Sequence, residues 1–145
     1  MGANPNNIGG QIVAVQATAN ASATSAQTGS AIDRIGFASG KLVISRGAAT
    51  GSPSSQTTDA KLQHSDTTTS GDFVDYTQPD GTAAAITQDT TSTAKVITLD
   101  VNLVGAKRYV RAVVTPALSG GSSPAFPLGS VLILGGASQL PAVAN

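Results

Sequence analysis

The feature that most constrains the fold is the near absence of straight-chain helix formers. The 145-residue chain contains no glutamate and a single methionine, whereas serine, threonine, valine and glycine recur throughout. Threonine and the branched aliphatic residues favour strands, and glycine and serine favour turns. Alanine is abundant, but between Ala17 and Ala26 it lies in low-complexity sequence without an apolar stripe that a helix could bury. The sequence therefore predicts an all-β protein.

The ionisable residues argue against several classes of function. Eight lysines and arginines balance eight aspartates, so the formal net charge is zero, and charged residues make up only 11% of the chain. A nucleic-acid-binding protein needs an excess of positive charge to neutralise phosphates. With no cysteine and one histidine, a thiol nucleophile is excluded, and a catalytic triad or a zinc site is very hard to assemble. We therefore expect no enzymatic activity, no cofactor, no metal site and no nucleic-acid partner.

The sequence carries no sign of export or membrane insertion. Residues 1–6 lack the basic region and apolar core of a secretory signal. No apolar run approaches the length of a membrane-spanning helix. We therefore expect a protein that is made in the cytoplasm, is soluble there and has no membrane partner.

Residues 1–31 differ in composition from the rest of the chain. Residues 12–15 form a short apolar stretch that could be a strand, whereas residues 16–30 are alanine, threonine, serine, glutamine, asparagine and glycine only. Such a composition offers little apolar surface to offset the entropy of ordering. The sequence therefore predicts a polar N-terminal arm over residues 1–31, either mobile or ordered against a partner, followed by one domain over residues 32–145.

Strand patterns separated by turn signals fill the predicted domain. Residues 59–66 alternate cleanly, with Ala60, Leu62 and His64 on one face. Pro79-Asp80-Gly81 is a turn, because proline presets φ and glycine accepts a positive φ. The spacing of about eight strands predicts an antiparallel two-sheet β-sandwich, jelly-roll-like in type. The expected strands cover residues 32–37 and 41–45 around a turn at Ser39-Gly40, and then residues 59–66, 73–76, 82–87, 94–103, 107–115 and 130–134.

Residues 94–115 give the most specific local prediction. A two-residue turn at Gly105-Ala106 suits a type II′ hairpin, since glycine stands first. In that register the apolar side chains share one face, whereas a three-residue loop would mix apolar with polar side chains. We therefore expect a hairpin in which Asp100 lies beside Arg111 and neutralises it. Its apolar pairs would be Val101 with Val110, Leu99 with Ala112, and Ile97 with Val114, and Asn102 would lie beside Tyr109.

Two groups of ionisable residues are better explained by structure than by chemistry. His64 is the only histidine and lies on the apolar face of its strand. A lone histidine cannot build a zinc site without other strong ligands, and no acidic triad spacing surrounds it, so we expect a structural role. Asp72, Asp75 and Asp80 cluster within nine residues, but they lack the alternating spacing and closing glutamate of an EF-hand calcium loop. We interpret them as a solvated turn region.

One basic and aromatic patch is a candidate for binding a protein. Lys107, Arg108, Tyr109 and Arg111 follow one another closely, and arginine and tyrosine are enriched among the anchors of protein interfaces. The alternative is an exposed strand with a cross-strand ion pair. We take Lys107, Tyr109 and Arg111 as candidate interface residues. Two apolar residues of the arm, Ile12 and Val13, complete this candidate set.

Four segments of the chain resemble small structural proteins of tailed bacteriophages. They are residues 31–37, 41–45, 60–66 and 105–115, the last of which carries the pattern G-x-K-R-Y-V-R. In that group a strand ending in aspartate precedes a short strand with phenylalanine, as Asp66 and Phe73 do here. The resemblance spans residues 31–115 and brings no catalytic residue with it.

The resemblance implies a function outside catalysis. The group includes capsid decoration or cement proteins, so it implies a virion component on the outside of an assembled capsid that bridges copies of the major capsid protein. It further implies a homotrimer, because capsid lattices offer three-fold positions, with the arm ordered on the capsid or on a neighbouring copy. One alternative is a tail, connector or head-spike component. Another is a carbohydrate-binding β-sandwich, which is disfavoured because the chain has no tryptophan and only two tyrosines to form an aromatic platform for a sugar.

Overall fold

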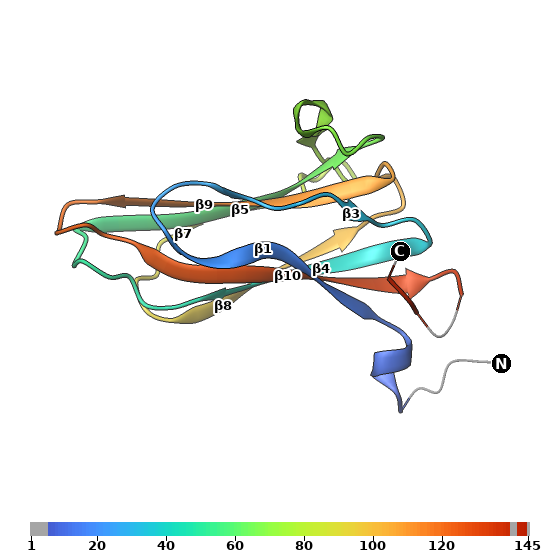
Figure 1. Cartoon of the computed structure of the whole chain (residues 1–145), viewed down its shortest axis with the longest axis horizontal. Coiled ribbons are helices and arrows are strands. Elements are labelled where there is room, and N and C mark those ends of the chain that lie inside the picture. Colours follow the sequence, from blue (N-terminus) through green and yellow to red (C-terminus); the bar gives the residue numbers. More distant parts are fainter. Residues whose placement is uncertain (1–5, 140–141, 145) are drawn as a thin grey trace.

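The computed structural model describes residues 6–139 and 142–144. Within these residues the chain forms ten strands and two short 3-10 helices (Figure 1). The long strands are β1 (Val13–Ala23), β4 (Phe37–Arg46), β5 (Ser55–Ser65), β8 (Lys95–Asn102), β9 (Tyr109–Ser119) and β10 (Phe126–Ala137). The short elements are η1 (Ile8–Gly10), β2 (Gln27–Thr28), β3 (Ile32–Asp33), η2 (Ser70–Asp72), β6 (Val74–Asp75) and β7 (Ala85–Asp89).

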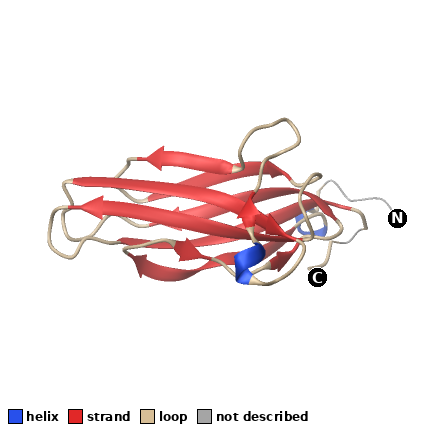
Figure 2. Cartoon of the chain, turned by 90° about the horizontal axis from the view of Figure 1, so that it is seen from above, coloured by secondary structure: helices blue, strands red, loops and turns tan. Residues whose placement is uncertain are grey.

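The strands form two antiparallel sheets that pack face to face (Figures 1 and 2). Sheet A has the order β1-β10-β4-β8, and sheet B has the order β2-β9-β5-β6, with β3 also paired to β9 and β7 to β5. The prediction of an all-β, antiparallel two-sheet sandwich is confirmed. The eight expected strands overlap β3 to β10, and the two additional strands, β1 and β2, lie within the predicted arm.

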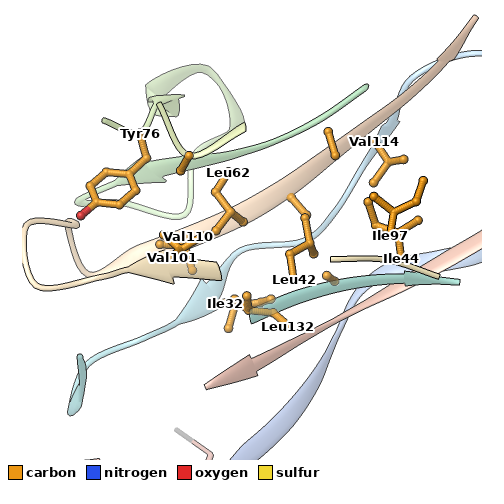
Figure 3. Packing of buried hydrophobic residues seen from close by; sticks show 14 of the residues in the cluster. Ile32, Leu42, Ile44, Leu62, Tyr76, Ile97, Val101, Val110, Val114 and Leu132 are labelled. Atoms are coloured by element: carbon orange, nitrogen blue, oxygen red, sulfur yellow. The ribbon is translucent and has the colours of Figure 1, made fainter. Parts of the chain in front are cut away.

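The core lies between the two sheets and follows the alternation of the strands. Leu42, Ile44 and Leu132 point inward from sheet A, and Leu62, Val110 and Val114 point inward from sheet B (Figure 3). All six are fully buried. Because side chains alternate along each strand, the same strands present a second set of side chains to solvent.

The predicted arm is corrected by the structure, because residues 13–28 belong to the sandwich. β1 pairs with β10 along its length, Ala17 and Ala23 are buried in the core, and β2 pairs with β9 in the other sheet. Val13 and Val15 pack against the core, and backbone pairing orders the small and polar residues that follow them. A small residue is required where the segment packs. A Cβ at Gly29 would lie 1.8 Å from the carbonyl oxygen of Ala17. Residues 1–5 of the predicted arm lie outside the described residues.

The predicted hairpin over residues 94–115 is wrong. β8 pairs with β4 in sheet A, β9 pairs with β5 in sheet B, and residues 103–108 cross between the sheets. Asp100 therefore lies opposite Lys41, at 2.7 Å between Nζ and Oδ1, and Arg111 lies opposite Gln63. The apolar faces of both strands still point into the core. Alternation assigns faces to strands, and a hairpin and a crossing between sheets bury the same faces.

Of the two predicted turns considered next, one is wrong and one is confirmed. The chain does not turn at Ser39-Gly40, which lie inside β4, but just before β4, where the N–H of Phe37 donates to the carbonyl of Arg34 and Gly36 has a φ of 85°. The turn at residues 79–81 is confirmed: the N–H of Gly81 donates to the carbonyl of Gln78 at 2.9 Å, and the φ of Gly81 is 86°.

Candidate protein-interaction site

Arg111 is the centre of a structured contact on the outer face of sheet B. It projects outward from β9 because Val110 and Ala112 on either side point into the core. Its Nε donates to Oε1 of Gln63 at 2.9 Å, and its Nη1 donates to Oγ of Ser70 at 2.9 Å. Its guanidinium carbon lies 4.3 Å from the centre of the Phe73 ring. We call Arg111, Gln63, Ser70 and Phe73 the Arg111 site.

Three separate elements assemble the Arg111 site. Gln63 comes from β5, directly opposite Arg111 in the register, whereas Ser70 belongs to η2 and Phe73 follows it. The loop that carries η2 rises above sheet B, shown in green in Figure 1. Two fixed hydrogen bonds and the ring hold the guanidinium in one orientation, which lowers the entropy that a partner's binding would cost.

The charge of Arg111 is uncompensated, unlike that of its neighbours. Lys61 lies 2.8 Å from Asp75, Lys107 lies 3.1 Å from Asp66, and Arg108 lies 2.7 Å from Asp33. Arg111 has no ion pair among the described residues, and both of its hydrogen-bond acceptors are neutral. Gln63, which accepts from Arg111, also donates its Nε2 to Oδ1 of Asp75 at 2.8 Å, and Asp75 itself pairs with Lys61.

Titration follows this pairing. Hydrogen bonds from Lys61 and Gln63 lower the pKa of Asp75, and the hydrogen bond from Arg108 lowers the pKa of Asp33. Both carboxylates therefore stay charged at neutral pH, and each belongs to its own partner. A carboxylate is the complementary group that Arg111 lacks within the described chain.

Lys107 and Tyr109 lie at the end of β9 near the crossing between the sheets. Lys107 is exposed, and Tyr109 is half-buried, with the guanidinium of Arg108 at 5.2 Å from its ring centre. The backbone N–H of Lys107 donates to Nδ1 of His64, whose ring lies 4.9 Å from that of Tyr76. Burial and the nearby charge of Lys107 lower the pKa of His64. The neutral imidazole is thus a structural acceptor that fixes the crossing.

The two remaining candidates lie on the other sheet. Val13 is opposite Leu134 and packs against the core. Ile12 lines a shallow hollow of about 750 Å³ together with Ile8 and Ile133. The structure therefore brings Lys107, Tyr109 and Arg111 to one face but does not bring Ile12 and Val13 to them.

Sequence reasoning overlooked a second structured arginine. Arg46, at the end of β4, has a fully buried side chain that lies 3.3 Å from Asp89 and donates to Oγ1 of Thr58 at 2.7 Å. Its guanidinium carbon lies 4.3 Å from the centre of the Phe126 ring. It joins the two sheets, since Thr58 and Asp89 belong to sheet B. The signal was readable, because Leu42, Ile44 and Arg46 share one strand parity.

Each of the three clustered aspartates has a partner of its own. Asp72 accepts a hydrogen bond from Thr67, Asp80 accepts one from Thr82, and Asp75 pairs with Lys61. In the part of the chain that the structure describes, no group of three or more metal-binding side chains comes together. No helix among the described residues is long and apolar enough to cross a membrane.

Comparisons with known proteins locate distant likenesses only. No protein-family model matches the chain, and no curated protein matches it. Among solved structures it is similar to the SPBc2 prophage-derived protein YomS, at 10% identity and a TM-score of 0.37, covering 85% of this chain and 91% of that one. A structure of infectious bursal disease virus, Gx strain, is similar at 11% identity and a TM-score of 0.43, covering 92% of this chain and 34% of that one.

A carbohydrate-binding module is similar to the same degree. It is the CBM36-1 domain of a multidomain xylanase from the hindgut metagenome of Trinervitermes trinervoides, at 10% identity and a TM-score of 0.42, covering 87% of this chain and 98% of that one. Likenesses this distant identify no family. The function therefore has to be inferred from the residues of this chain.

Proposed function

We propose that this protein is a virion structural protein that binds the outer surface of an assembled phage capsid and stabilises it by bridging capsid subunits. The observation that carries the proposal is the Arg111 site: a half-buried arginine, oriented by Phe73, Gln63 and Ser70, whose charge no carboxylate of the described chain compensates. Arginine and aromatic anchors of this kind are enriched at the centres of protein interfaces.

The chemistry of the site selects the kind of partner. A carboxylate that accepts from the free edge of the guanidinium would complete the pairing that Asp75 does not provide, so the site fits an acidic patch on a protein. The resemblance of residues 31–115 to phage structural proteins supplies the class of that protein, the major capsid protein. Many weak contacts repeated on a lattice give strong total binding, so a single small site on each copy suffices.

The location of the protein in the particle tests the proposal. Virions of the phage that encodes this chain are separated into heads and tails, and each fraction is probed for the protein with an antibody. The proposal expects the protein on the heads, and its removal is expected to make the heads break at lower temperature. Recovery on tails would favour a tail, connector or spike component instead, and absence from every particle would refute the proposal.

A further inference from the structure

The outer edge of β8 is an unprotected strand edge. β8 is the last strand of sheet A, and within the described residues no strand pairs with it on the side away from β4. Its eight residues pair with β4 without a single register shift. Edge strands are commonly protected by bulges, prolines or coverage, because their free N–H and C=O groups can pair with another chain. β1, at the opposite edge, has two irregularities in its register.

The hydrogen bonds show which backbone groups of β8 are free. The N–H of Leu103 donates to the carbonyl of Ala38, so the backbone groups of the odd-numbered residues in β8 face β4. The N–H of Asn102 instead donates to Oε1 of Gln78, away from β4. Since alternate residues of a strand direct their backbone groups to opposite sides, the backbone groups of Val96, Thr98 and Asp100 point out of the sheet.

The free segment of this edge has defined ends. Asn102 is already satisfied, because its N–H reaches Gln78 and its carbonyl accepts from the hydroxyl of Tyr76 at 2.7 Å. At the other end Lys95 is bound to Asp89, which lies in sheet B. Thr98 is exposed and is the midpoint between Val96, which is 61% exposed, and Asp100.

The charged side chains at this edge do not block it. The carboxylate of Asp100 is held by Lys41 on β4, and the ammonium of Lys95 is held by Asp89. Neither charge is directed across the edge toward an approaching strand. The outward-directed residues Val96, Thr98 and Asp100 are symmetric about Thr98, so an antiparallel second copy would place an outward-directed residue opposite each of them.

We propose that two copies of this protein pair through β8, antiparallel about a two-fold axis at Thr98, so that sheet A continues from one copy into the other. Thr98 would lie opposite Thr98 of the second copy, and Val96 opposite Asp100, in both directions. The outward backbone groups of all three residues are then paired. This two-fold contact is closed and uses the same surface on both copies, so it replaces the homotrimer that the phage resemblance implies.

A single cysteine tests the axis directly. The chain has no cysteine, and directly opposite residues in such a pair have Cα atoms about 5.5 Å apart, which suits a disulfide. The full-length Thr98→Cys variant is oxidised mildly and run on a non-reducing gel. We expect a covalent dimer as the main product. The matched control is Ala117→Cys, exposed on the outer face of sheet B, which is expected to give at least tenfold less dimer.

A second pair of variants tests the backbone pairing without a crosslink. Thr98→Pro removes an N–H that β4 does not use, whereas Thr98→Val keeps it; proline is tolerated at edge positions of this kind. In sedimentation at several concentrations we expect Thr98→Val to dimerise like the parent and Thr98→Pro to dissociate at least tenfold more readily, with thermal unfolding confirming that both fold.

The proposal is overturned if the parent chain stays monomeric throughout, if it forms a trimer that Thr98→Pro does not affect, or if Thr98→Cys crosslinks no better than Ala117→Cys. Capsid binding is a separate result. If the protein is found on heads as a monomer, only the proposed β8 dimer is refuted. If it dimerises but is absent from all particles, only the proposed function is refuted.

Discussion

Two arginines of this protein make the same local contact in different surroundings. The guanidinium carbons of Arg46 and Arg111 both lie 4.3 Å from the centre of a phenylalanine ring, Phe126 and Phe73 respectively. Arg46 is fully buried between the sheets and paired with Asp89, whereas Arg111 is half-buried on an outer face and has only neutral acceptors. Both arginines therefore contact a ring in the same way. They differ in burial and in whether a carboxylate is paired with the guanidinium.

The difference shows how one contact serves two purposes. A buried arginine costs desolvation energy that only a carboxylate and further hydrogen bonds can offset, so Arg46 is committed to the fold and its loss should unfold the protein. Arg111 keeps water on one side and needs no internal carboxylate. Its stacking on Phe73 orients the guanidinium without neutralising it, so the charge stays uncompensated within the described chain. The expected consequences of substitution differ accordingly.

The largest expected effect is at the buried pair. Asp89→Ala leaves the charge of Arg46 buried and uncompensated, which costs about 3–5 kcal/mol in comparable cases. Asp75→Ala breaks the exposed pair with Lys61 beside the Arg111 site, and exposed pairs are worth about 0.2–1 kcal/mol. Urea unfolding of the two variants measures both values. Equal losses would show that the two regions do not differ in the way described.

The second expectation concerns acid. The hydrogen bond from Lys95 is the largest cause that lowers the pKa of Asp89, from 3.8 to about 2. Because the folded state holds the proton less tightly than the unfolded state, the carboxylate of Asp89 contributes stability above pH 3.8 that is lost as the pH falls toward 2. The parent should therefore lose its advantage over Asp89→Asn across that range. Unfolding of both proteins at successive pH values measures the difference, and a constant gap would contradict the assignment.

The parts of this structure that could be predicted are those that alternation determines. Residues 59–66 were assigned to a strand with Ala60 and Leu62 inward, and the structure buries both. The same alternation could have shown Arg46 to be inward. It could not decide whether β8 and β9 form a hairpin or belong to different sheets, because both arrangements bury the same side chains. The pairing of Asp100 with Arg111 failed for that reason.

Two other features of the structure, strand β1 and the Arg111 site, could not be predicted from composition. The apolar residues 12–15 indicate a possible strand at the start of β1, but the alanine-rich remainder of β1 carries no apolar signal for its backbone pairing with β10. The Arg111 site depends on a loop that returns Ser70 and Phe73 to β9, and no local pattern specifies where a loop returns. Residue type alone makes Arg111 an interface candidate. Residue type could not show that its charge has no ion pair among the described residues, which the structure adds.

The third expectation separates charge from shape at Arg111. Arg111→Lys keeps the charge but loses the planar group that stacks on Phe73 and donates to two acceptors at once. If the site binds capsid as proposed, we expect Arg111→Ala and Arg111→Lys each to weaken binding about tenfold or more, since interface anchors typically contribute more than 1.4 kcal/mol. Co-sedimentation with capsids from which the protein has been removed measures the affinity. Lys61→Ala, which alters a paired cation on the same face, is the matched control and should bind normally.

The smallest expected effect tests whether the ring orients the arginine. Phe73→Leu keeps most of the apolar volume but removes the ring face beneath Arg111, and contacts of this kind at exposed sites are worth about 0.5–1 kcal/mol. We expect capsid binding to weaken about two- to fivefold, less than for Arg111→Lys, because the hydrogen bonds to Gln63 and Ser70 remain. Combining Phe73→Leu with Arg111→Ala should then add nothing further to the loss, since the ring acts only through the arginine. A double variant markedly weaker than Arg111→Ala would show instead that Phe73 meets the partner itself or supports the loop around η2 independently, and the comparison with the Arg46 pair would then hold for the fold but not for binding.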